Sequence, residues 1–248
     1  MPLPHTFFTI LLILDILVLA VLIPYGHLHH QDPGYFMREG KTITHLSAVQ
    51  LGAIGLLSLL ILKQRWPISG KSSLLWLAIG AGFIFLTVDD LVQFHENLDK
   101  WIHHWVGRKP NNITTRLDDV IILLYGIIGA GIMWINRAEL KNYRALLPYL
   151  VWGFVFLILC VGLDVFTHRT DAIEFLISDA QVYMPILYWL HPLEDIFKIL
   201  AEGIFSGTFY AAFYQTLKAP RGAVFPAAQQ QYSSFRADDR CTEYDRVV

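Results

Sequence analysis

Six long stretches of the chain consist almost entirely of apolar residues, and polar residues gather in the segments between them. Runs of about 20 apolar residues are long enough to cross the hydrocarbon core of a bilayer. Because lipid cannot satisfy exposed backbone groups, such runs are expected to form α-helices. The pattern predicts an all-α, polytopic membrane helix bundle with spans at residues 7–23, 43–62, 74–94, 118–135, 146–166 and 193–216.

The chain changes character after the sixth run. Residues 218–248 are polar and contain several Pro, Gln and Ser residues, a composition typical of segments without a packed core. We therefore predict two parts, a bundle at 1–217 and a disordered tail at 218–248. Small residues at helical spacing, such as Gly203 and Gly207, are expected to let helices approach closely. The prolines near predicted span ends are expected to mark helix boundaries. They are Pro24, Pro67, Pro110, Pro148 and Pro192.

Composition supports a membrane protein. Of the 248 residues, 54% are hydrophobic and 16% are charged, whereas an average soluble domain has about 25% charged residues. The net charge of −2 gives no indication of nucleic-acid binding. The N-terminus lacks the basic segment and small-residue cleavage site of a signal peptide, so the first run is expected to remain as a span. These features predict a multi-pass protein of the cell membrane.

Basic residues predict the orientation of the bundle. Cytoplasmic loops and ends of membrane proteins carry an excess of Lys and Arg. By span order, the side that holds the N-terminus has this excess, and the margin comes from the tail with Lys218, Arg221, Arg236, Arg240 and Arg246. Both termini are therefore predicted to be cytoplasmic, and the opposite end of the bundle to face outward.

Histidines and carboxylates gather at that predicted outer end. The histidines placed there by span order are His27, His29, His30, His45, His95, His103, His104, His168 and His191. The carboxylates at this end are Asp89, Asp90, Glu96, Asp99, Asp118, Asp119, Asp164, Glu194 and Asp195. A charge inside a span costs roughly 2.5–3.5 kcal/mol on insertion scales. Because Lys198 can neutralise only one or two of these acids, the others need a proton, water or a bound cation.

Helical spacing predicts which of these side chains share a face. Asp164 and His168 are four residues apart, so both can point to one place. Two longer stripes are expected. The first is Asp89, Gln93, Glu96, Lys100 and His103, and the second is His191, Asp195, Lys198 and Glu202. Three interpretations need no bound ligand: Lys198 could pair with Glu194 or Glu202 of its own helix, Asp118 and Asp119 could cap the fourth helix, and Asp15 could pair with a polar group.

The ligand types favour a metal site. Mixed His and carboxylate ligands suit zinc, iron or manganese. The proposed ligand pool is Asp89, Asp90, His95, Glu96, Asp164, His168, His191, Glu194 and Asp195. Such a metal would activate water or polarise a lipid-like substrate, with Glu96 as general base. The chain has no HExxH sequence and no paired Glu-x-x-His motif, so the hypothesis depends on composition and span order.

The run from Leu86 to Leu98, LTVDDLVQFHENL, resembles a motif of uncharacterised bacterial multi-span membrane proteins. Those proteins carry a Leu-Asp-Glu sequence followed by His-Glu and a leucine. Asp89, His95, Glu96 and Leu98 match this pattern, and Asp90 stands where the family usually has Glu. The resemblance implies a site at this position but no particular activity.

Two other functions remain open at this point. The acids could form a relay or vestibule in a proton- or cation-coupled transporter or channel subunit, with Asp15 and Glu202 deepest in the membrane. Alternatively, the protein could be a membrane anchor or subunit that binds partner proteins through its outer loops, above all a long loop predicted at 168–191. The residues proposed for such contacts are Asp171, Glu174, Asp179, Tyr183, Tyr188 and Trp189.

Overall fold

The computed structural model describes residues 3–38, 40–94, 105, 117–167 and 180–218, and these contain helices but no strands. The long helices are α1 (Leu3–His30), α2 (Thr42–Ser69), α3 (Leu74–Val92), α5 (Leu117–Ile135), α7 (Leu147–Thr167) and α9 (Ala180–Lys218). Short helical segments η1 (Gly70–Ser73), α6 (Arg137–Leu140) and η3 (Lys141–Leu146) connect some of them. The predicted all-α class is therefore confirmed.

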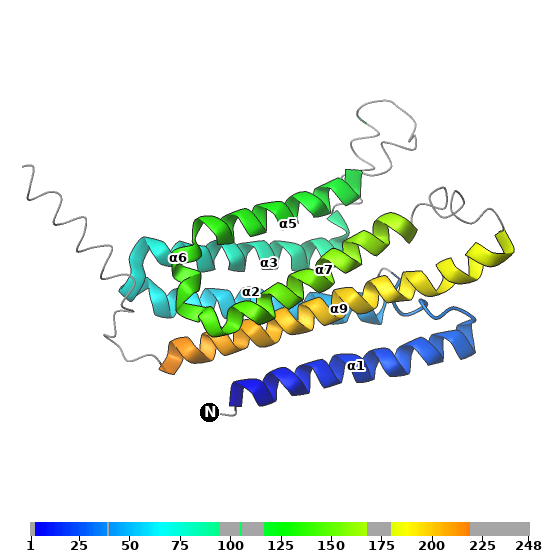
Figure 1. Cartoon of the computed structure of the whole chain (residues 1–248), viewed down its shortest axis with the longest axis horizontal. Helices are drawn as coiled ribbons and strands as arrows, with labels where there is room; N and C mark the ends of the chain where they lie inside the picture. The colour runs from blue at the N-terminus through cyan, green and yellow to red at the C-terminus, as the bar shows by residue number, and fades with distance from the viewer. Residues whose placement is uncertain (1–2, 39, 95–104, 106–116, 168–179, 219–248) are drawn as a thin grey trace, which may run out of the picture.

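The long helices lie alongside one another and alternate in direction (Figure 1). α1, α3 and α7 end where α2, α5 and α9 begin. We call this the histidine end, because the last turn of α1 carries His27, His29 and His30 there. The opposite end, where α9 finishes at Lys218, is called the tail end. This alternation is the arrangement that the predicted span order requires.

Five helices are long and apolar enough to cross a membrane: α1, α2, α3, the helical stretch that includes α7, and α9. α5 has a shorter apolar stretch, Leu124–Ile135, in its described part. Large apolar side chains such as Ile10, Val21, Leu56 and Ile158 are exposed on the outside of the bundle. An apolar exterior suits lipid as the surrounding solvent. The bundle is thus compatible with an integral membrane protein, and the sixth span and the orientation stay predictions.

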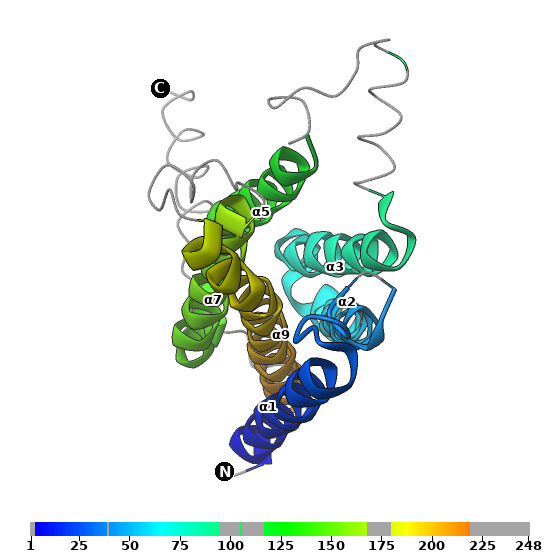
Figure 2. The same cartoon turned by 90° about the vertical axis from the view of Figure 1, so that its right-hand side faces the viewer.

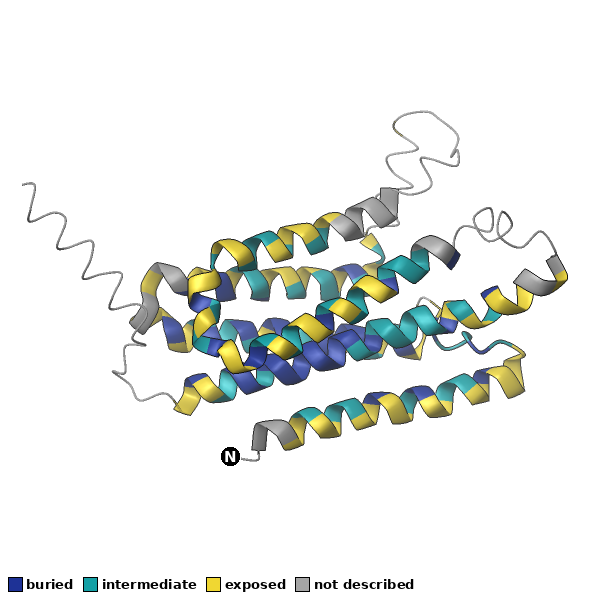
Figure 3. Ribbon diagram, in the orientation of Figure 1, coloured by how far each residue is buried: buried dark blue, intermediate teal, exposed yellow. Residues whose placement is uncertain are grey.

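The bundle is built around α9. Viewed end on, α9 lies between α7 on one side and α1 and α2 on the other (Figure 2). Residues 201–209 are all buried (Figure 3). The apolar core here joins Phe205 and Phe209 of α9 to Ile54 of α2 and Trp76 of α3. A Cβ on Gly207 would overlap the ring of Phe8, which confirms that this small residue permits close approach of α1 and α9.

Three helices extend beyond the predicted spans, and their prolines lie inside them. α1 continues six residues past Pro24, α2 contains Pro67, and α9 contains both Pro185 and Pro192. The expectation that Pro24, Pro67 and Pro192 mark boundaries was wrong, whereas Pro148 does lie at the start of α7. In α9 the reason is tertiary packing, because the Tyr188 hydroxyl donates to the Gln31 carbonyl at 2.8 Å and Pro192 lies against Gly34.

The early start of α9 also corrects the segment proposed for partner binding. Tyr188, Trp189 and His191 belong to a helix and not to a loop. The remaining acidic residues of that proposal, at 171, 174 and 179, lie outside the described residues.

α3 is shorter than the pattern predicted. It ends at Val92, and Gln93 adopts a left-handed conformation with φ 56° and ψ 46°. The backbone amide of Gln93 donates to the carbonyl of Asp89 at 2.7 Å, which closes the helix there. The expected stripe from Asp89 through Gln93 to Glu96 is therefore wrong as a feature of one continuous helix.

A buried ion pair connects the helices near the tail end. Arg65 of α2 donates from Nε to Glu139 Oε1 at 2.8 Å and from Nη2 to Oε2 at 3.0 Å. Trp76 of α3 and Asn142 of η3 also donate to the Glu139 carboxylate. The pattern of apolar runs placed Arg65 and Glu139 in connecting segments and gave no indication that they would meet. The pair ties α2 and α3 to the short helix α6.

The Glu139→Gln variant should have a lower midpoint of thermal unfolding in detergent than the wild-type protein. The change leaves Arg65 buried beside a neutral amide, and removing one partner of a buried ion pair costs about 3–5 kcal/mol. Lys63→Gln, which removes an exposed charge from the same helix, is the control. Equal midpoints for the two variants would contradict a stabilising role of this ion pair.

Candidate functional site

The interior of the bundle contains a lysine–aspartate pair between α9 and α3. Lys198 Nζ donates to Asp90 Oδ1 at 2.6 Å. The Lys198 side chain is 30% exposed and that of Asp90 is 15% exposed. α1, α3 and α7 contain no Lys or Arg, so Lys198 supplies the fixed positive charge for the acids around it. The alternative in which Lys198 pairs with acids of its own helix holds only in part, because Lys198 interacts electrostatically with Glu202 whereas its hydrogen-bonded partner, Asp90, lies on α3.

Other acids surround this pair toward the histidine end. Asp195 of α9 interacts electrostatically with Lys198, Asp90 and Asp164 of α7. Glu194 accepts a hydrogen bond from the Thr167 hydroxyl at 3.3 Å. α3, α7 and α9 thus deliver carboxylates to one region, as their span order predicted. We call Asp90, Asp164, Glu194 and Asp195 the outer acidic group.

A second polar group lies deeper, where α1, α2 and α9 meet. Gln50 Nε2 donates to Asp15 Oδ1 at 2.6 Å, and the Ser47 hydroxyl donates to Glu202 Oε1 at 2.8 Å. The Ser206 hydroxyl donates to the backbone carbonyl oxygen of Gln50 at 3.5 Å. Asp15 is 3% exposed and Glu202 is 5% exposed. We call Asp15, Ser47, Gln50 and Glu202 the deep polar group.

The deep polar group and the outer acidic group interact electrostatically. Glu202 interacts electrostatically with Lys198, Asp90 and Asp15. The spacing of Asp195, Lys198 and Glu202 places them on one side of α9, which confirms the second predicted stripe for these residues. A series of ionisable side chains therefore extends from the histidine end into the buried middle of α9.

These acids outnumber their positive partner. Asp15, Asp90, Asp195 and Glu202 interact directly or through one another with a single lysine. A buried charge is unfavourable unless it is paired, hydrogen-bonded or neutralised. Repulsion among the acids and the cost of removing them from water therefore favour uptake of protons or other cations, because Lys198 alone cannot compensate four carboxylates.

The structure brings together only part of the predicted ligand pool. Asp90, Asp164, Glu194 and Asp195 form the outer acidic group, and Asp89 is buried and interacts electrostatically with Tyr125 of α5. His191 is exposed on α9. His95, Glu96 and His168 lie outside the described residues, as do the side chains of Asp118 and Asp119.

Across the described ranges, no three His, Cys, Asp or Glu side chains are placed to hold a metal ion. The described carboxylates thus do not complete a metal site by themselves. A mixed site would need the histidines or the glutamate at 95, 96 and 168, so the predicted metal remains a hypothesis.

Sequence reasoning missed Ser47 and Gln50, which hold the two deep carboxylates. Both lie in the second apolar run, three residues apart, and Gln50 is a large polar residue in a predicted span. That spacing puts both on one helical face and was the available signal. For Asp15, the structure confirms the interpretation that it pairs with a polar group of the bundle.

Aromatic residues cover the histidine end of α1 and α9. His30 stacks on Tyr35 with ring centroids 3.6 Å apart, and Tyr25 lies 4.4 Å from His29. His27 Nδ1 and the Tyr188 hydroxyl are 3.0 Å apart. These histidines therefore belong to an aromatic cluster in the described structure, and aromatic residues of this kind are enriched at membrane interfaces.

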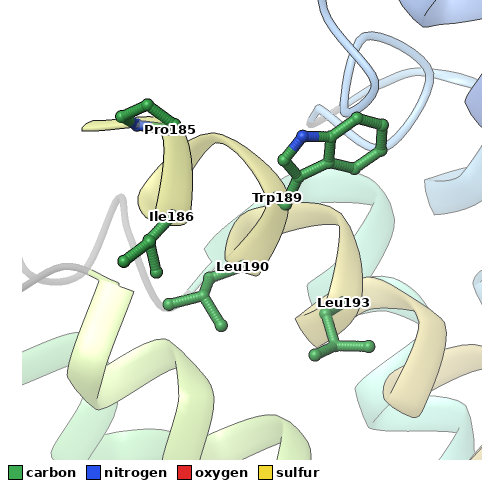
Figure 4. Close-up of a pocket in the computed structure, with 5 residues that line it drawn as sticks. All are labelled: Pro185, Ile186, Trp189, Leu190 and Leu193. Atoms are coloured by element: carbon green, nitrogen blue, oxygen red, sulfur yellow. The ribbon is translucent and has the colours of Figure 1, made fainter. Parts of the chain in front are cut away.

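A shallow pocket lies on α9 beyond the outer acidic group (Figure 4). Its lining is apolar and comes from one stretch of this helix: Pro185, Ile186, Trp189, Leu190 and Leu193. No acidic side chain lines it, so it is separate from the polar groups described above.

The fold and the interior charges define the class of protein: a helical bundle, compatible with integral membrane insertion, that contains buried acidic groups. Within that class, the chain belongs to a family described as a domain of unknown function (DUF8692), whose model matches residues 6–213. That match covers the bundle from α1 to α9. No curated protein and no solved structure matches the chain.

A double-mutant cycle at Lys198 and Asp90 tests whether they stabilise each other. Lys198→Met and Asp90→Asn should each lower the free energy of unfolding in detergent, because each removes the charge-assisted hydrogen bond between α9 and α3. The double variant should lose less than the sum of the two, with a coupling of about 1–3 kcal/mol, within the range for residues in contact. Additive losses would contradict the pair.

Proposed function

We propose that this protein is a cation-coupled membrane transporter that takes up protons from the histidine end of the bundle. The observation that carries the proposal is the excess of buried and half-buried carboxylates over Lys198 along one side of α9. Ionisable residues inside spans commonly mark ion pathways and proton relays. The outer acidic group would receive cations, and Asp90 and Lys198 would pass them toward Glu202 and Asp15.

The half of the bundle nearer the tail end argues for a gated transporter over an open channel. Between the deep polar group and the Arg65–Glu139 pair lies the apolar core, which includes Ile54, Phe205 and Phe209. The buried hydroxyls of this region, on Ser58, Thr208 and Thr216, donate to backbone carbonyls of their own helices, so the layer offers little to replace the hydration of an ion. Passage would therefore require a rearrangement of this layer, as in alternating access.

Lys198 has a defined role in this proposal. Its ammonium group is bonded to Asp90 and also interacts electrostatically with Glu202 and Asp195. A proton that reaches any of these carboxylates weakens its attraction for Lys198, so the ammonium group can shift to another acid. The lysine would thereby couple the occupancy of the outer acidic group to that of the deep polar group.

Proton uptake into proteoliposomes tests this function. With a pH gradient across the membrane and a pH-sensitive dye inside, wild-type protein should dissipate the gradient faster than protein-free liposomes. Asp90→Asn and Asp195→Asn should slow this dissipation by at least about tenfold, the factor that corresponds to 1.4 kcal/mol. Both variants keep the size of the side chain and remove its charge.

The matched control is Asp32→Asn, which removes a carboxylate from the segment between α1 and α2 where Asp32 pairs with Arg38. This variant should transport as the wild type does. If protein-containing and protein-free liposomes dissipate the gradient equally, the proposed transport is wrong. If Asp32→Asn and Asp90→Asn slowed dissipation of the gradient equally, the outer acidic group would not be the route of the protons.

A metal-dependent membrane protein is the second candidate. It is favoured by the approach of Asp164 of α7 to Asp195 of α9, beside Glu194. Zinc, iron or manganese would take these carboxylates together with histidines. We propose Asp89, Asp90 and His191 as further members of this ligand pool, and His95, Glu96 and His168 from outside the described residues. Glu96 would be the general base in an enzymatic version.

Elemental analysis of the purified protein separates the two candidates. A metal site predicts near-stoichiometric transition metal in the wild type and its loss in Asp164→Asn/His168→Ala. The control is again Asp32→Asn, which should keep the wild-type metal content. Wild-type protein without metal, or a folded double variant with unchanged metal, would contradict this candidate.

A further inference from the structure

The hydrogen bonds of the deep polar group leave three of its oxygen atoms without a donor. Asp15 Oδ2, Gln50 Oε1 and Glu202 Oε2 are buried, and none accepts a hydrogen bond within the described part of the chain. Unsatisfied buried acceptors are rare in native structures, and each costs about 1–3 kcal/mol. Three of them from three different helices at one helix junction therefore indicate that something donates charge or hydrogen bonds to them.

The hydrogen bonds that Gln50 and Ser47 already make determine which of their atoms remain available as acceptors. Asp15 Oδ1 lies 2.6 Å from the Gln50 amide, so the amide must present its donor, Nε2, to the carboxylate. That leaves Gln50 Oε1 as an acceptor directed elsewhere. Likewise the Ser47 hydroxyl uses its hydrogen on Glu202 Oε1 and keeps its own lone pairs available.

Gly203 keeps space for the Asp15 carboxylate beside Glu202. A Cβ at Gly203 would overlap Asp15 Oδ2 and would lie 3.4 Å from Leu11 Cδ2. The free oxygen of Asp15 therefore lies against the backbone of α9 at the residue that follows Glu202. Gln50 of α2 is 6% exposed and lies at the same junction, where its backbone carbonyl accepts from Ser206 of α9. The three side chains thus lie buried at one junction of α1, α2 and α9, where Asp15 and Glu202 also interact electrostatically.

We propose that Asp15, Ser47, Gln50 and Glu202 form a binding site for one Na⁺ ion. Each of the four side chains offers one oxygen atom as a ligand, and oxygen is the ligand type that hard cations prefer. The ion would satisfy the unpaired oxygens and offset one of the two buried negative charges. Lys198 interacts electrostatically with Glu202 and offsets part of the second negative charge.

A monovalent ion suits this site better than a divalent one. Ca²⁺ takes 6–8 oxygen ligands, and Mg²⁺ usually keeps several waters in its coordination sphere. Four protein oxygens in a closed junction of three helices supply neither environment. The inference adds a bound Na⁺ ion to the proposed transporter and rests on that function only for transport, because Na⁺ binding can be measured without any flux.

Equilibrium binding of radioactive Na⁺ to detergent-purified full-length protein is the test. The wild type should bind about one Na⁺ per chain, and excess K⁺ or choline should not displace it. Asp15→Asn and Glu202→Gln should each weaken Na⁺ binding at least about tenfold, while Asp32→Asn should bind as the wild type does. Circular dichroism and gel filtration of each variant verify the fold.

A second measurement keeps the test decisive where a variant folds poorly. Na⁺ that binds only the native state raises the unfolding midpoint of the wild type, and Ser47→Ala, which keeps both carboxylates, should reduce this increase. Absence of Na⁺ binding in the wild type, equal effects of Na⁺, K⁺ and choline, or full binding by Asp15→Asn would each overturn the site.

The outcomes also separate this inference from the proposed function. Dissipation of a pH gradient in Na⁺-free buffer, together with no Na⁺ binding, would support proton transport and reject the sodium site. Stoichiometric Na⁺ binding without any proton or Na⁺ flux would support the site and reject transport.

Discussion

The arrangement of this bundle depends on the cost of placing charge where water is absent. Lys198 can stay inside because Asp90 accepts its hydrogen bond at 2.6 Å, and Asp15 and Glu202 stay inside because Gln50 and Ser47 donate to them. Each of these contacts joins two different helices. The polar contacts therefore position α1, α2, α3 and α9 relative to one another, and they leave a set of carboxylates whose charge exceeds that of the lysine.

The two ends of the bundle handle charge differently. Near the tail end, Arg65 and Glu139 form a closed pair with two hydrogen bonds, and Trp76 and Asn142 supply further donors. Toward the histidine end, acids from three helices surround one lysine. The first arrangement is balanced and serves to hold helices together. The second carries excess negative charge, which is why we assign cation uptake to it and not to the Arg65–Glu139 pair.

The sequence predicted the elements well because lipid-spanning helices have a strong composition signal. Apolar length located all six long helices, and span order alone placed Asp90, Asp164 and Asp195 at one end. Helix ends were less predictable. Pro192 should end a helix by local preference, but contacts from the segment after α1 hold α9 together beyond it. The left-handed Gln93 likewise interrupts a stripe that spacing alone would continue.

Partner choice was the least predictable part of the site. Spacing within α9 suggested that Lys198 would meet its own neighbours, whereas its hydrogen-bond acceptor comes from α3. The side chains of α3 reach those of α9 beside α2, as the contacts of Phe83 with Phe205 and Phe209 show. Ser47 and Gln50 were missed for a related reason. A single hydroxyl or amide in an apolar run gains significance only when an acid from another helix lies opposite it.

Infrared difference spectroscopy of the reconstituted protein tests the central claim most directly, namely that its buried carboxylates hold cations. Without Na⁺, the account predicts a C=O band of protonated carboxyl groups that shrinks when Na⁺ is added and is altered in Asp15→Asn and Glu202→Gln. No protonated carboxyl band and no response to Na⁺ would contradict it, because the acids would then be ionised and compensated without any bound cation.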